Sequence, residues 1–175
     1  MMSPKGFTGL TAMISGMVVI LAGCGPDQHR EQASARKEIP KHEHVPPHGG
    51  TAVELGEEEF HLELVLDRAS GRLTAYILDS HLENFVRIQA STFEIEAKIA
   101  ASARPLIFQA VADQSTGEKV GDTSMFEVTA DWLKSVESFD GKLNGLEIKG
   151  KRYSGVVFNF PKGNEASVGN SGVKP

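Results

Sequence analysis

The chain has 175 residues, of which 40% are hydrophobic and 23% charged, and its formal net charge is −5 at pH 7. This length accommodates one domain with a single core, and the acidic balance lacks the basic footprint on which nucleic-acid binding depends. The single cysteine excludes an intramolecular disulfide and any zinc or redox site built from several cysteines.

The first 24 residues contain the parts of a secretory signal. Residues 1–7 carry one basic side chain, Lys5, and residues 9–21 are almost entirely apolar or small. The motif Leu21-Ala22-Gly23-Cys24 follows, and it resembles the lipobox of bacterial lipoproteins. An uncleaved membrane helix is the alternative, but the apolar run is shorter than the ~20 residues that span a bilayer. We therefore expect a signal peptide over residues 1–23.

The resemblance to lipoproteins implies a location and a first partner. It implies cleavage before Cys24 and a diacylglycerol on the Cys24 sulfur, whose acyl chains bind a membrane. The protein is then expected on the periplasmic side of the cell envelope. Gly25 and Pro26 stand where enterobacterial sorting, by resemblance, uses an aspartate to retain lipoproteins at the inner membrane. Their presence favours the outer membrane.

Composition divides the remaining chain into three parts. Residues 24–47 are rich in proline and charge and hold almost no large apolar side chain, which predicts a flexible tether behind the lipidated cysteine. Residues 161–175 are rich in glycine, asparagine and serine, and this composition predicts a disordered tail. The domain itself is expected over residues 48–160.

Within the domain the hydrophobic pattern repeats every two residues. In residues 59–66, Phe60, Leu62 and Leu64 share one face, while His61 and Glu63 share the opposite, polar face. Further strands are expected at residues 51–55, 72–78, 92–99, 106–112, 124–129, 146–149 and 153–160. Residues 67–71 and 150–151 have the composition of hairpin loops. Residues 131–139 have a helical pattern and predict one or two turns of helix.

Eight short strands at regular spacing predict an all-β fold with antiparallel pairing. An immunoglobulin-like β-sandwich of two packed sheets is the expected architecture. A small barrel is the alternative, because both architectures bury alternate residues of each strand.

Histidine is the residue type that points to chemistry. Five of the six histidines lie between positions 42 and 81, namely His42, His44, His48, His61 and His81. Imidazole is a common metal ligand, and together with a carboxylate such as Glu63 it suits zinc and similar divalent ions. A dedicated Cu(I) site is disfavoured because Met125 is the only soft ligand after Cys24. The simpler alternative is that these histidines are solvated side chains that bind nothing.

Three stretches between residues 47 and 79 carry a family resemblance. Residues 47–53 read Pro-His-Gly-Gly-Thr-Ala-Val, residues 60–66 contain His-Leu-Glu-Leu-Val, and residues 71–79 read Gly-Arg-Leu-Thr-Ala-Tyr-Ile-Leu-Asp. Together they resemble a small β-domain found in cobalt-zinc-cadmium-type efflux adaptors and in related envelope lipoproteins. The resemblance implies periplasmic metal binding, with His48 and His61 at the matching positions. The chain lacks the long helical hairpin of the adaptors, which limits it to an accessory role beside a metal-efflux system.

No pattern predicts an enzyme. The segment Asp79-Ser80-His81 holds the residue types of a catalytic triad, but adjacency in sequence does not give triad geometry. The sequence has no Gly-x-Ser-x-Gly elbow, no phosphate-binding Gly-Lys-Ser loop and no His-Glu-x-x-His motif. The expected function is binding or buffering of a divalent metal through His44, His48, His61 and Glu63, with His42 and His81 as further candidates. The alternative is a lipid-anchored interaction module without a metal.

Overall fold

A computed structural model describes residues 45–165 of the chain. The expectations for the signal peptide, Cys24, His42 and His44 concern residues outside this range. The described part contains the strands β1 (Thr51–Leu55), β2 (Phe60–Asp67), β3 (Arg72–Asp79), β4 (Thr92–Ile99), β5 (Ser102–Ala110), β6 (Met125–Thr129), β7 (Phe139–Ile148), β8 (Lys151–Tyr153) and β9 (Val156–Phe160), and the short 3₁₀ helix η1 (Asp131–Lys134).

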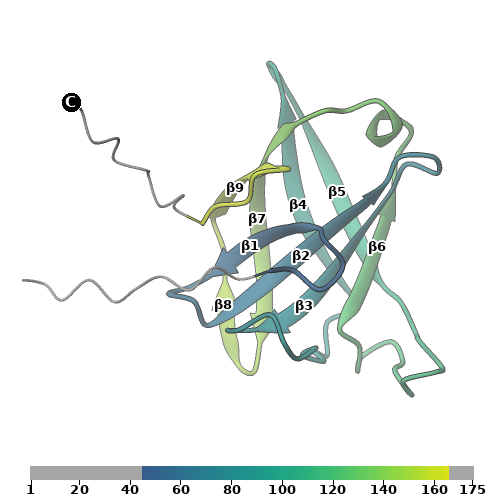
Figure 1. The fold of residues 1–175 in the computed structure, drawn as a ribbon, viewed down its shortest axis with the longest axis vertical. Coiled ribbons are helices and arrows are strands. Elements are labelled where there is room, and N and C mark those ends of the chain that lie inside the picture. The colour runs from purple at the N-terminus through teal and green to yellow at the C-terminus, as the bar shows by residue number, and fades with distance from the viewer. Residues whose placement is uncertain (1–44, 166–175) are drawn as a thin grey trace, which may run out of the picture. The chain divides into compact units, whose positions relative to one another are not determined.

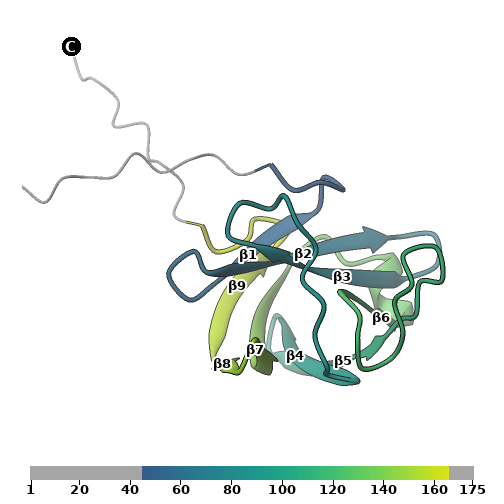
Figure 2. The same ribbon diagram turned by 90° about the horizontal axis from the view of Figure 1, so that it is seen from below.

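The strands form one antiparallel sheet in the order β1-β2-β3-β6-β5-β4-β7-β8, with β9 also paired to β7. Figure 2 shows this sheet curled around its core, with β1, β2 and β3 on one side and β4, β5 and β7 on the other. The predicted all-β, antiparallel fold is confirmed. The single curled sheet corresponds to the small barrel rather than to two separate sheets, a distinction that depends on which distant strands pair.

The alternating pattern of β4 places its side chains as predicted. Phe93, Ile95 and Ala97 are buried, whereas Glu96 and Lys98 are exposed. Phe93 stacks on Phe108 of β5 with the ring centroids 4.7 Å apart, and Phe126 of β6 packs edge-on against it. These rings join three neighbouring strands in the core, where each buried aromatic side chain contributes about 3 kcal/mol or more.

Strand β7 is much longer than the sequence pattern indicated. It begins at Phe139, where the expected short helix was to end, and it runs through Gly141 and Gly145. Glycine weakens a strand unless a neighbouring side chain covers it. Here Phe158 of β9 lies across Gly141 so closely that an added Cβ would meet its ring, with Cε1 at 2.6 Å. The glycine is therefore part of the packing between β7 and β9.

The two ends of the curled sheet are joined by side chains rather than by a strand ladder. The Asn164 amide donates to the carbonyl of Glu54 at 3.0 Å and accepts from the Glu54 N–H at 2.7 Å, as a neighbouring strand would do. The Thr51 hydroxyl donates to the Pro161 carbonyl at 3.2 Å. Residues 161–165 thus belong with β1, beyond the expected domain boundary at residue 160.

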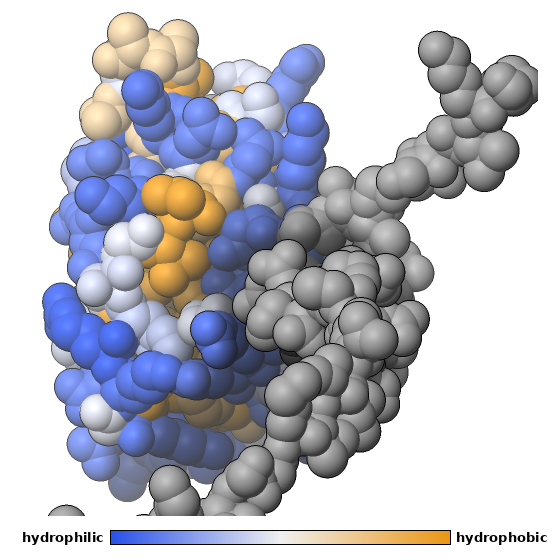
Figure 3. Space-filling model, turned by 90° about the vertical axis from the view of Figure 1, so that its left-hand side faces the viewer, coloured by the Kyte–Doolittle hydropathy of each residue, from blue (hydrophilic) through white to orange (hydrophobic). Residues whose placement is uncertain are grey.

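On the face shown in Figure 3, hydrophilic side chains predominate and surround a hydrophobic area at the centre. Five large hydrophobic side chains of residues 45–165 are exposed: Val45, Phe85, Ile107, Val120 and Val157. None of the helical segments in residues 45–165 has the length and hydropathy needed to cross a membrane.

Candidate functional site

A buried carboxylate organises the His-Gly-Gly motif that stands at the entrance to the domain. Glu63 in β2 is fully buried, and its Oε1 accepts hydrogen bonds from the backbone N–H groups of His48 at 2.7 Å and Gly50 at 3.0 Å. Its Oε2 lies 2.7 Å from Nδ1 of the His48 ring. A carboxylate without water needs such partners, because an unpaired buried charge is strongly destabilising.

The two glycines of the motif are required for different physical reasons. Gly49 has φ = +67°, a left-handed conformation that glycine adopts without strain. Gly50 is needed for space, because a Cβ there would lie 2.6 Å from the carbonyl oxygen of Leu64 and 2.9 Å from Cγ of Glu63. Together they let the backbone lie against β2 and direct two amides at one carboxylate.

Aromatic side chains hold the other face of the His48 ring. Tyr76 of β3 is the direct cross-strand neighbour of Glu63, and its ring stacks on His48 with a centroid distance of 4.1 Å and an angle of 15°. Phe85 packs at a tilt against both rings. Burial raises the pKa of the Tyr76 hydroxyl, and the nearby carboxylates of Glu127 and Glu63 raise it further. The three sequence stretches that carry the family resemblance therefore meet at one place.

The contact with Glu63 determines which nitrogen of His48 is free for chemistry. A carboxylate oxygen accepts hydrogen bonds, so Nδ1 carries the hydrogen that lies between the two groups. In a neutral ring Nε2 then keeps its lone pair. The His48 side chain is 37% exposed, whereas Glu63 is shielded from water. His48 can thus act as a hydrogen-bond acceptor or as a metal ligand through Nε2.

His61 shares the outer face of β2 with Glu63, as predicted, but this face is covered and is not exposed to solvent. His61 is 1% exposed; its Nδ1 lies 3.1 Å from the Asp79 carbonyl oxygen and its Nε2 lies 3.6 Å from Oε1 of Glu165. Half-buried strands usually leave their polar face open to solvent, but on β2 that face is covered at His61 and Glu63. Residues 48–50 and 163–165, which no strand pattern includes, cover this face.

His81 lies in the exposed loop that follows β3. Its backbone N–H points to Oδ1 of Asp79 at 3.3 Å, and Glu83 donates to the same oxygen at 3.0 Å. Burial raises the pKa of the Asp79 carboxyl, but hydrogen bonds from the Asn84 side chain and from loop N–H groups outweigh that effect and hold the pKa below its usual value. Asp79 thus shapes the loop that carries Phe85 toward His48.

A pocket of about 490 Å³ opens beside the stacked rings. His48, Tyr76 and Phe85 form its aromatic wall. Polar residues and one thioether complete the lining: Asn84, Arg87, Asp113, Thr116, Glu118, Ser124 and Met125. The volume of this pocket and its mixture of aromatic and polar lining residues are typical of sites that bind small molecules.

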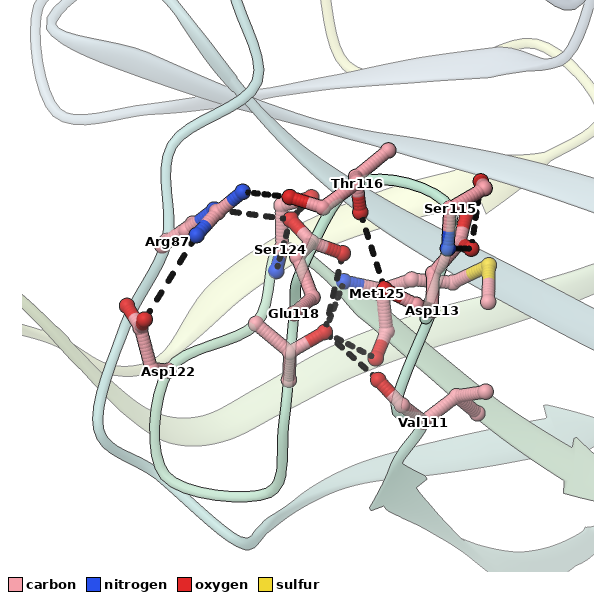
Figure 4. Close-up of polar contacts among 10 residues, drawn as sticks. Arg87, Val111, Asp113, Ser115, Thr116, Glu118, Asp122, Ser124 and Met125 are labelled. Atoms are coloured by element: carbon pink, nitrogen blue, oxygen red, sulfur yellow. Dashed lines mark hydrogen bonds and ion pairs between the residues drawn. The ribbon is translucent and has the colours of Figure 1, made fainter.

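A satisfied polar network builds the far wall of this pocket (Figure 4). Glu118 is buried; it lies 3.3 Å from Nε of Arg87 and accepts from the Ser124 hydroxyl at 2.8 Å. Arg87 also donates to the Thr116 carbonyl at 2.6 Å and lies 3.5 Å from Oδ2 of Asp122. The network joins the loop between β5 and β6 to the segment before β4, so its first role is structural.

The described residues include one candidate metal ligand. His48 fits the role of a ligand, because its ring is fixed and one nitrogen is available. Within residues 45–165, no three side chains of histidine, cysteine, aspartate or glutamate gather closely enough to hold an ion. Cys24, His42 and His44 lie outside the described residues. The stacking role of Tyr76 was not predicted, although this residue lies in the stretch 71–79 that carries the resemblance. No sequence pattern pointed to Arg87 or Glu118.

Comparison of this chain with protein-family models, with curated proteins and with solved structures gave no match.

Proposed function

We propose that this chain is an exported lipoprotein, anchored to an envelope membrane through Cys24, whose β-domain binds a divalent metal ion. It would buffer or deliver that ion as a non-enzymatic accessory to metal efflux or homeostasis. Zinc best suits a ligand set of imidazole and carboxylate groups. The observation that carries the proposal is the 2.7 Å contact between Nδ1 of His48 and the buried carboxylate of Glu63.

The same kind of contact is found at metal-binding histidines in general. A ligating imidazole almost always donates its second N–H to a carboxylate or carbonyl group, which fixes the ring and raises the basicity of the ligating nitrogen. In the proposed site His48 binds the ion through Nε2, and Glu63 orients the ring. Direct ligation by Glu63 is not part of the proposal, because its two oxygens already accept three hydrogen bonds.

The other ligands are proposed to come from the segment that precedes the domain. His44 and His42 lie four and six residues before His48, a separation short enough for the chain to bring all three imidazoles to one ion. Ordering this segment on binding costs conformational entropy. The proposed site is therefore one of moderate affinity and fast exchange, which suits a buffer or a delivery protein.

Zinc binding is expected to depend on His48 and on pH. Calorimetric titration of residues 25–175 should give one zinc ion per chain at pH 7.5, and the His48→Ala variant should bind at least about tenfold more weakly. Affinity should fall at pH 5.5, because protons compete with the metal for the imidazole nitrogens. The proposed ligand set of His48, His44 and His42 does not include His81, so His81→Ala is the matched control and should bind as the unaltered chain does. Equal affinity in His48→Ala and His81→Ala would contradict the proposed site.

The Glu63→Gln variant tests whether zinc binding requires the orientation and tautomer of the His48 ring that Glu63 sets, and not only the presence of His48. The glutamine carbonyl can still accept from the two backbone N–H groups, but its NH₂ group then faces Nδ1 and donates to it. The ring proton must move to Nε2, so the nitrogen proposed to bind metal loses its free lone pair. We expect zinc affinity to fall by about 10- to 100-fold, and ¹⁵N spectra of the imidazole should show the changed tautomer. Unchanged affinity together with a changed tautomer would remove Glu63 from the site.

Lipid attachment is tested independently of the metal. Full-length protein expressed in a bacterial host should incorporate labelled palmitate and partition into the detergent phase of a Triton X-114 extract. Cys24→Ser should abolish both, because the thioether to diacylglycerol requires the sulfur. Labelling that survives the substitution would show that another group carries the lipid.

A second candidate function is supported by the pocket beside His48. Its aromatic wall and the half-exposed Phe85 are features of sites that bind an organic ligand or a partner side chain. In that case the protein is a lipid-anchored interaction module, and its histidines bind no metal. Weak zinc binding that is indifferent to His48→Ala would favour this function.

A further inference from the structure

A second groove, separate from His48, gathers basic side chains in a chain whose net charge is negative. It has a volume of about 600 Å³ and lies between residues 87–92 and the β7–β8 hairpin, which is at the lower end of the sheet in Figure 1. Arg87, Lys149 and Arg152 line it, together with one acidic residue, Glu147. Arg87 is already neutralised by Glu118 and Asp122, so the charge available to a ligand comes from the hairpin.

The guanidinium of Arg152 is positioned by a glycine rather than by an acidic partner. Glu147 is the direct cross-strand neighbour of Arg152, yet within residues 45–165 no carboxylate oxygen lies within 4.0 Å of the Arg152 guanidinium. The guanidinium instead lies over Gly145, where an added Cβ would be 2.7 Å from its Cζ. The missing side chain at position 145 thus makes the space in which the charged group rests, with its donors unused by a salt bridge.

Lys149 is placed at the rim of the same groove by the hairpin turn. Lys149 and Gly150 have φ values of 48° and 81°, the left-handed pair that forms a tight two-residue turn. The Lys149 ammonium lies 5.5 Å from the centroid of the Phe60 ring, a cation–π distance that restricts the side chain. Within the described residues it too forms no ion pair at 4.0 Å or less.

We propose that this groove binds a phosphate-bearing anion, with Arg152 as the principal ligand and Lys149 as the second. The planar guanidinium presents parallel N–H groups that match two oxygens of a phosphate, and the ammonium adds a point charge. The Glu147 carboxylate repels any anion in the groove, so binding depends on both cations. Free phosphate and the headgroup of an anionic lipid share this chemistry.

Titration by NMR tests the site on the full-length chain in a neutral detergent. Inorganic phosphate should shift the amide resonances of Gly145 and of residues 149–152 in a saturable manner. Arg152→Gln should weaken binding about tenfold, the effect of losing one charge-assisted pair of hydrogen bonds. Lys142→Gln removes an equal charge from an exposed position on β7 and should leave the dissociation constant unchanged. Equal weakening by the two substitutions, or no saturable shift with phosphate, overturns the proposal.

Gly145→Ala distinguishes a built site from general electrostatic attraction. The alanine keeps every charge but displaces the Arg152 guanidinium, so binding should weaken as much as in Arg152→Gln. If Gly145→Ala does not give a folded spectrum, Arg152→Lys takes its place, because it keeps the charge and loses the planar fork; it should weaken binding at least about threefold. Full affinity in a folded charge-preserving variant overturns the proposed geometry.

A second arm identifies the source of the anion. Short-chain phosphatidylglycerol is compared with inorganic phosphate, and phosphatidylcholine of the same chain length is the zwitterionic control. Tighter binding of phosphatidylglycerol than of either comparison assigns the groove to a lipid headgroup. If phosphate binds as tightly as phosphatidylglycerol, or more tightly, the natural ligand of the groove is assigned as a free phosphate compound.

Discussion

Gly50→Ala is expected to lower the free energy of unfolding by about 3 kcal/mol, the upper end of the range for overpacking at a closed site. The new methyl group would lie 2.6 Å from the Leu64 carbonyl oxygen and 2.9 Å from a methyl carbon of Val65. Backbone on β2 cannot move away without breaking its pairing with β1 and β3. Urea unfolding should show a lower midpoint with an unchanged slope, the sign of lost stability rather than of a different unfolded state.

Gly49→Ala is the matched control, one position earlier in the same motif. No heavy atom lies within 4 Å of a Cβ built at Gly49, so the only penalty is the left-handed backbone at φ = +67°. That penalty is about 1–2 kcal/mol for a non-glycine residue. If Gly49→Ala were as destabilising as Gly50→Ala, close packing against β2 would not be the reason for the second glycine.

Glu63→Ala is expected to lower the free energy of unfolding by about 3 kcal/mol. The substitution leaves the N–H groups of His48 and Gly50 and the Nδ1–H of His48 without their acceptor. Each buried donor that loses its partner destabilises by about 1–3 kcal/mol, and part of this loss is recovered because the exposed His48 ring can turn to water. Thermal and urea unfolding should report the loss, and backbone amide exchange should rise first in residues 48–50.

Glu96→Ala provides the comparison for the loss of a carboxylate as such. Glu96 is exposed on β4, and surface substitutions of this kind change stability by about 0.5 kcal/mol or less. Glu63→Gln should fall between the two, because it keeps two of the three hydrogen bonds and reverses the third. A stability loss in Glu63→Ala no larger than in Glu96→Ala would mean that the carboxylate does not hold the motif.

The same residues thus have a structural role and are proposed to have a functional one. Glu63 anchors residues 48–50 against the sheet, and this anchoring is what fixes the His48 ring on Tyr76. The tautomer change in Glu63→Gln separates the two roles, because it alters the ligating nitrogen while it preserves most of the hydrogen bonds that matter for folding.

The alternation of apolar and polar residues was sufficient to predict a strand where that strand is half-buried and continuous. The alternation in residues 92–99 predicted both the strand and the side chains that enter the core, and residues 51–55 match β1 at both ends. The pattern failed at β7, because Gly141 and Gly145 are typical of loops when they are read alone. What makes them compatible with a strand is the cover that Phe158 and Arg152 provide from other strands. That cover is a tertiary contact and leaves no local signal.

The sequence by itself determined the all-β class, the antiparallel pattern, and the common face of β2 that His61 and Glu63 share. Only the tertiary structure decided that one sheet curls into a barrel and that His61 and Glu63 are buried. Alternation says which residues share a face, but both faces of a strand can be covered. Here the outer face of β2 is covered by residues 48–50 and 163–165, which lie ten or more residues from β2 in sequence. Hydrogen bonds and a side-chain contact hold these residues in place, and the periodicity of the sequence does not predict them.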